Sequence, residues 1–167
     1  MDARRDSEPA PMKNPATVER KSDRELVIAR TFNAPARIVF EAWTKPELFR
    51  RWWAPKSSGA TVVSCDMDVR VGGGYRLEFG HEAASETMAF FGRYIEVTPP
   101  SRLVWTNDES ADAAVTTVTF EELGGKTLLV LHELYPSKEA LDAAIAGMEG
   151  GMPEQFEQLD ELLITLQ

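Results

Sequence analysis

The sequence has one cysteine, two histidines and no long apolar run. A single Cys65 cannot form an internal disulfide, and a cysteine-based zinc site needs several such ligands, so both kinds of scaffold are excluded. A run of about 18 apolar residues, the length of a membrane-spanning helix, occurs nowhere. Met1 is followed by charged residues rather than by the apolar core of a secretory signal. These absences predict a reducing, cytoplasmic location and no membrane association.

Positive charge is also scarce. Lys and Arg total 18 against 27 Asp and Glu, which gives a formal net charge of -9. A protein of this sign repels a phosphate backbone on average, so no nucleic-acid partner is expected. The chain has 167 residues, of which 43% are hydrophobic and 27% charged, and this is the composition of one globular domain with a single core.

Catalytic and cofactor-binding motifs are missing as well. The sequence contains no His-Glu-x-x-His, no nucleophile elbow and no paired-cysteine motif. Residues 72–74 are consecutive glycines, but they lie between two predicted strands and no Lys-Ser or Lys-Thr follows them. A hairpin turn is therefore predicted there instead of a phosphate-binding loop. We expect no cofactor and no metal site, and no catalytic residue can be named from a motif.

Residues 1–24 differ from the rest of the chain in composition. They are rich in charge and proline and contain only three large apolar residues. This composition predicts a polar, flexible N-terminal tail, of which residues 16–24 are able to add an edge strand to a sheet. Residues 25–167 are predicted to form a single domain.

From residue 25 onward, alternation with a period of two predicts strands, and apolar stripes with the helical period predict helices. The predicted strands are 25–32, 63–70, 75–79, 88–97, 103–106, 114–121 and 127–134. Two short helices begin near Pro35 and Pro46, and a long amphipathic helix closes the chain. Short turns between the strands imply antiparallel neighbours. The order predicts an α+β fold in which a curved antiparallel sheet of six to seven strands grips the C-terminal helix.

Several short motifs support this fold. They are Arg30-Thr31-Phe32-Asn33-Ala34-Pro35, Ala42-Trp43-Thr44, Arg51-Trp52-Trp53, Asp68-Val69-Arg70-Val71-Gly72-Gly73, Gly92-Arg93-Tyr94 and Leu159-Asp160. In this order, the sequence over about residues 25–166 resembles the START and Bet v 1-like (SRPBCC) helix-grip superfamily. Within it, the sequence is similar to the C-terminal domain of the heat-shock protein 90 ATPase activator homologues. One fold hosts many activities, so the resemblance implies the architecture more firmly than the function.

Large side chains on the predicted inner faces are the most informative feature for function. A helix laid against a curved sheet leaves an interior that is either filled by such groups or open as an apolar pocket. His132 is the predicted polar group of this interior, on one face of the last strand with Leu128 and Val130. The predicted ligand-binding residues are Trp43, Tyr75, Phe79, Trp105, Phe120, His132, Met148, Met152 and Phe156.

Three functions are compatible with these residues. The first is a domain that binds a small apolar molecule in a cavity between the sheet and the C-terminal helix. The second, implied by the resemblance, is a protein-interaction module that engages a chaperone. The third is a cyclase or hydrolase-like enzyme that uses His132. A homodimer is compatible with each of them, through an exposed strand edge or residues 52–53.

Overall fold

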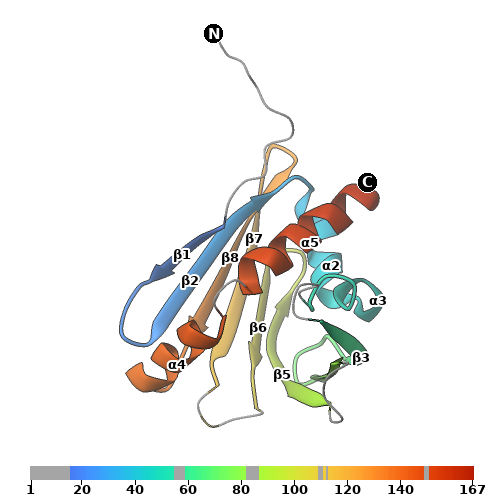
Figure 1. Cartoon of the computed structure of the whole chain (residues 1–167). Helices are drawn as coiled ribbons and strands as arrows, with labels where there is room; N and C mark the ends of the chain where they lie inside the picture. The colour runs from blue at the N-terminus through green and yellow to red at the C-terminus, as the bar shows by residue number, and fades with distance from the viewer. Residues whose placement is uncertain (1–15, 55–58, 82–86, 109–110, 112, 149–150) are drawn as a thin grey trace.

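The computed structural model describes residues 16–54, 59–81, 87–108, 111, 113–148 and 151–167 (Figure 1). The strands are β1 (Thr17–Arg20), β2 (Glu25–Phe32), β3 (Ala60–Met67), β4 (Gly74–His81), β5 (Met88–Thr98), β6 (Arg102–Thr106), β7 (Val115–Leu123) and β8 (Lys126–Leu134). The helices are α2 (Ala36–Thr44), α3 (Pro46–Phe49), α4 (Lys138–Met148) and α5 (Gly151–Thr165). None of the helices in these ranges is long and apolar enough to cross a membrane.

All eight strands form one sheet in the order β1-β2-β8-β7-β6-β5-β4-β3, and every neighbouring pair is antiparallel. The predicted α+β class and the seven strands from residue 25 onward are confirmed. The total of six to seven was too low because β1, inside the predicted tail, pairs with β2. All four residues of β1 are exposed. An edge strand with no buried side chain leaves little trace in a hydropathy pattern.

One face of the sheet carries the core, and α5 covers it. On β2, every second residue from Leu26 to Phe32 is buried. Helix α5 contributes Phe156, Leu159 and Leu163, which are fully buried and spaced three and four residues apart. The ring of Phe156 meets the ring of Phe32 edge to face, with centroids 5.5 Å apart. The predicted packing of an amphipathic C-terminal helix on the sheet is confirmed.

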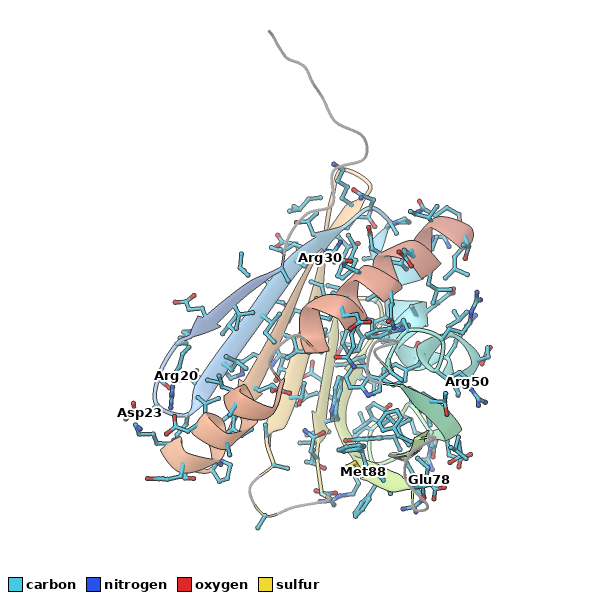
Figure 2. All side chains as sticks on the ribbon, viewed as in Figure 1. Arg20, Asp23, Arg30, Arg50, Glu78 and Met88 are labelled. Atoms are coloured by element: carbon cyan, nitrogen blue, oxygen red, sulfur yellow. The ribbon has the colours of Figure 1, made fainter. Side chains whose placement is uncertain are left out.

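A buried ion pair joins β2 to α5. Arg30 lies on the core face of β2, and its guanidinium Nη2 is 3.6 Å from Oδ2 of Asp160 on α5. Both side chains are nearly inaccessible, with 3% and 12% of their surface exposed. The guanidinium carbon also lies 5.2 Å from the ring centroid of Phe32, which is within the range of a cation–π contact. Figure 2 labels Arg30 on β2, at the level where α5 passes.

Strand β5 pairs with two different neighbours along its length. Residues 88–93 pair with β4, and residues 94–98 pair with β6. The register shifts between Tyr94 and Glu96, an irregularity that bends a strand and increases its twist. The β3–β4 hairpin is therefore offset from β6 along β5, which is visibly curved in Figure 1.

Candidate functional site

A pocket of about 390 Å³ lies between the offset end of the sheet and the two short helices. Strands β3 to β6 form one wall, and α2, α3 and the segment after α3 form the other. The residues that line it are Trp43, Phe49, Trp53, Ala54, Met67, Tyr75, Leu77, Phe79, Phe90, Tyr94, Trp105, Asn107 and Gln155. Among the α5 residues whose side chains are described, from residue 154 onward, only Gln155 lines the pocket, so the pocket lies beside that part of the helix rather than beneath its length.

Trp43 of α2 is the centre of the aromatic cluster behind the pocket. Its ring centroid lies 4.8 Å from that of Trp52 and 5.9 Å from that of Trp105. Phe120 and Phe156 pack against the same ring at 6.2 and 6.5 Å. Edge-to-face contacts of this kind stabilise beyond the area that they bury. The cluster fixes the floor of the pocket through rigid side chains.

Of the nine predicted site residues, the structure brings four together at the pocket. These four are Trp43, Tyr75, Phe79 and Trp105. Phe120 and Phe156 are buried one layer deeper, against Trp43. Met148 ends α4 and Met152 lies in the first turn of α5, but their side chains lie outside the described part of the structure.

The prediction for His132 is wrong. His132 lies opposite Val27 and Thr117 on the outer face of the sheet, away from the core. Its Nε2 is 2.9 Å from Oε1 of Glu25, and both side chains are about one-third exposed. Hydrogen bonds from His132 and then Ser22 hold the pKa of Glu25 below its usual value. His132 therefore cannot orient a molecule in the pocket.

Two glutamines of α5 hold the helix-side wall. Nε2 of Gln155 donates to the carbonyl oxygen of Trp53, and Nε2 of Gln158 donates to the carbonyl oxygens of Trp52 and Ala54 at 2.9 and 3.0 Å. These bonds supply hydrogen-bond donors to backbone carbonyls in the segment just after α3. The sequence analysis missed them, although two glutamines three residues apart on the apolar side of a helix were a visible signal.

A chain of polar groups leads from the pocket into the core. The hydroxyl of Tyr75 donates to Oδ1 of Asn107 at 2.8 Å, and Nδ2 of Asn107 donates to Oγ1 of Thr116 at 3.0 Å. Thr116 in turn donates to Oε2 of Glu133 at 3.4 Å, and the hydroxyl of Tyr135 donates to Oε1 at 2.7 Å. Glu133, not His132, is therefore the ionisable residue of β8 that faces the core.

Desolvation raises the pKa of Glu133 above its usual value of 4.5, against the opposing effect of the hydrogen bonds from Tyr135 and Thr116. In the folded protein the carboxyl keeps its proton at pH values where the unfolded chain has lost it. The stability that it contributes is therefore complete below about pH 4.5 and is lost as the pH rises through the folded pKa.

We expect Glu133→Gln to remove the pH dependence of folding stability that Glu133 causes. The amide stays neutral, so the variant should match the wild type near pH 4.5 and exceed its unfolding free energy at pH 8. Urea unfolding at several pH values between these limits measures the difference. Glu121→Gln, a change at an exposed position on β7, should leave the pH profile unchanged. Parallel profiles for the wild type and Glu133→Gln would contradict the assignment.

Cys65 lies beside the pocket, next to one of its lining residues. Its Sγ is 3.6 Å from Sδ of the lining residue Met67. Burial, aided by the carboxylates of Asp66 and Glu47 and opposed by Arg50, raises the pKa of the thiol to about 11. Since the thiolate is the reactive form, this cysteine is a packing residue at neutral pH.

Comparison with known proteins supports the architecture. A search of curated proteins found no match. Among solved structures, a protein from Rhodobacter sphaeroides is 26% identical, with a TM-score of 0.83 over 91% of this chain and 99% of its own. A protein from Staphylococcus epidermidis is 29% identical, with a TM-score of 0.76 over 90% and 95%. An AHSA1-like protein from Aeromonas hydrophila is 19% identical, with a TM-score of 0.65 over 84% and 93%, and shows the fold alone.

The family assignment comes from the sequence itself. The model of the family described as "Activator of Hsp90 ATPase homolog 1-like protein" matches residues 33–164. This range starts just after β2 and ends one residue before the end of α5, so it contains all the residues that line the pocket. It covers most of the predicted domain and agrees with the resemblance carried by its motifs. The chain belongs to the activator of Hsp90 ATPase homolog 1-like family.

Proposed function

We propose that this protein binds a small, largely apolar molecule with aromatic character in the pocket between β3–β6 and helices α2 and α3. The observation that carries the proposal is the composition of the wall, in which eight of the thirteen lining residues are aromatic. Apolar surface in contact with water is unfavourable by about 25 cal/mol per Å², so a molecule that covers this wall gains the corresponding free energy. A ligand with flat aromatic rings can stack on, or pack edge to face against, the aromatic side chains of this wall.

The polarity of the wall favours binding over catalysis. The thirteen described lining residues include no Asp, Glu, Lys, Arg or His. General acid–base catalysis most often uses a His or a carboxylate within hydrogen-bond reach of the reacting atoms. The enzyme hypothesis relied on His132, which lies on the other face of the sheet. The chaperone partner and the homodimer remain predictions.

Filling the pocket tests the proposal. Leu77 lies on β4 between Tyr75 and Phe79, and all three line the wall. We expect Leu77→Trp to occupy the volume and weaken binding of the neutral fluorescent probe N-phenyl-1-naphthylamine by about tenfold or more, because the larger side chain takes up space that the probe needs; this loss corresponds to about 1.4 kcal/mol. Probe fluorescence measures the affinity, and circular dichroism checks the fold.

The matched control is Val63→Trp. Val63 is on β3, is 52% exposed and is absent from the lining, so the same new side chain should leave the affinity unchanged. Equal loss in both variants, or no loss in Leu77→Trp, would contradict the proposal. So would a wild-type protein that does not bind the probe.

A further inference from the structure

Tyr94 is an almost fully buried residue whose hydroxyl makes no hydrogen bond within the described part of the chain. Tyr94 lies on β5 and lines the pocket, and only 5% of the residue is exposed. Its ring is wedged between those of Tyr75 and Trp105, at centroid distances of 5.8 and 6.4 Å. Among the described residues, the fully buried side-chain atoms without a hydrogen bond are Nε of Arg30 and Nε1 of Trp43. The unpaired oxygen of Tyr94 is not one of them, so it is accessible from the pocket that the residue lines.

The hydroxyl of Tyr75, whose ring packs against that of Tyr94, has the hydrogen-bond partners that a tyrosine in this wall normally has. The single hydroxyl hydrogen of Tyr75 has two acceptors within reach, Oδ1 of Asn107 at 2.8 Å and the carbonyl oxygen of Thr106 at 3.0 Å. The Tyr94 ring lies against the same wall, but its hydroxyl meets none of these acceptors. Desolvation raises the pKa of Tyr94 well above its usual value of 10.0, so the hydroxyl remains a neutral O–H donor at physiological pH.

We infer that the hydroxyl of Tyr94 donates a hydrogen bond to an acceptor oxygen on the bound molecule and thereby sets its orientation. The ligand class is then an aromatic or otherwise apolar body that carries a carbonyl or comparable acceptor, rather than a pure hydrocarbon. This inference rests on the proposed function, since it assigns the polar contact of the same pocket. An O–H donor without a partner in an apolar wall favours ligands that carry a hydrogen-bond acceptor at that point and discriminates against ligands that lack one.

Two probes of nearly equal shape separate the inference from the proposed function. 2-Acetylnaphthalene has a carbonyl oxygen where 2-isopropenylnaphthalene has a methylene group. We expect the wild-type protein to bind the ketone about five- to tenfold more tightly, the value of one net hydrogen bond. In Tyr94→Phe, which removes only the hydroxyl, the ratio should fall to about one while affinity for the hydrocarbon is maintained. Titration followed by tryptophan fluorescence measures all four affinities.

Tyr135→Phe is the matched control, because it removes a hydroxyl that is bonded to Glu133 and lies outside the pocket lining. The preference for the ketone should persist in this variant. Thermal unfolding of the free proteins adds a second readout: Tyr135→Phe should lower the melting temperature, whereas Tyr94→Phe should leave it unchanged or raise it, since no bond is lost.

Each other outcome has a distinct meaning. If both probes bind the wild type equally, the pocket binds apolar molecules and the role of Tyr94 is wrong. If the preference survives in Tyr94→Phe, another group is the donor and the inference is also wrong. If Tyr94→Phe is destabilised as much as Tyr135→Phe, the hydroxyl has a protein partner and the inference fails. If neither probe binds, the proposed function fails together with the inference.

Discussion

Replacing Asp160 by asparagine is expected to lower the free energy of unfolding by about 3–4 kcal/mol. The change leaves the guanidinium of Arg30 buried without its countercharge, and removing one member of a buried pair costs this much because the remaining ion stays desolvated. Nε of Arg30 already has no hydrogen-bond partner among the described residues, so the loss of Asp160 is not compensated locally. For a chain of this size, the melting temperature should fall by about 10 °C.

Two further variants make this result specific. Asp142→Asn breaks a pair with Arg20 in which both side chains are at least one-third exposed, and it should have little effect on urea unfolding. The double change Arg30→Met with Asp160→Leu replaces the pair by apolar groups and should recover most of the stability. A loss in Asp160→Asn no larger than that in Asp142→Asn would show that the pair contributes nothing.

Gly92→Ala is expected to have a comparable effect at the other end of the sheet. Gly92 lies in the half of β5 that pairs with β4, close to the end of β6. A Cβ there would overlap the carbonyl oxygen of Thr106 and lie 2.9 Å from Cε2 of Tyr75. The oxygen of Thr106 belongs to the backbone and cannot rotate away, so β5 and β6 must move apart. We expect this to lower the free energy of unfolding by about 3 kcal/mol or more. Binding of N-phenyl-1-naphthylamine should weaken as well, since Tyr75 lines the pocket.

Gly80→Ala supplies the comparison on β4. Its new methyl group would meet Cγ2 of Val63 at 2.8 Å, a side chain that is half exposed and able to move. Chemical denaturation of the two variants should therefore show a much smaller loss for Gly80→Ala. Similar losses would mean that the close approach of β5 to β6 is not what requires glycine at residue 92.

The elements were predictable because local patterns determine them, but the orientation of one strand was not. In β8, Leu128 and Val130 on one face and Leu129 and Leu131 on the other are equally apolar, so the sequence does not distinguish the faces. Pairing with β2 and β7 decides which face is buried. That choice places Glu133 toward the core and His132 on the outer face, whereas the sequence analysis placed His132 in the interior.

The candidate site was half predictable for a similar reason. Trp43, Tyr75 and Trp105 are large inward side chains, and periodicity identifies such residues. Tyr94 and Gln155 were missed because their positions at the pocket follow from the split pairing of β5 and from where α5 crosses it. Both are results of tertiary packing, which the local sequence does not encode.

The amide groups of Gln155 and Gln158 have a consequence for protein synthesis. They bond backbone carbonyls of residues 52–54, more than 100 positions earlier in the chain. During translation, residues 52–54 leave the ribosome long before Gln155 and Gln158 are synthesised. These hydrogen bonds therefore cannot form during most of translation. Trp52 and Trp53 therefore lack these native partners until residues 155–158 have emerged from the exit tunnel.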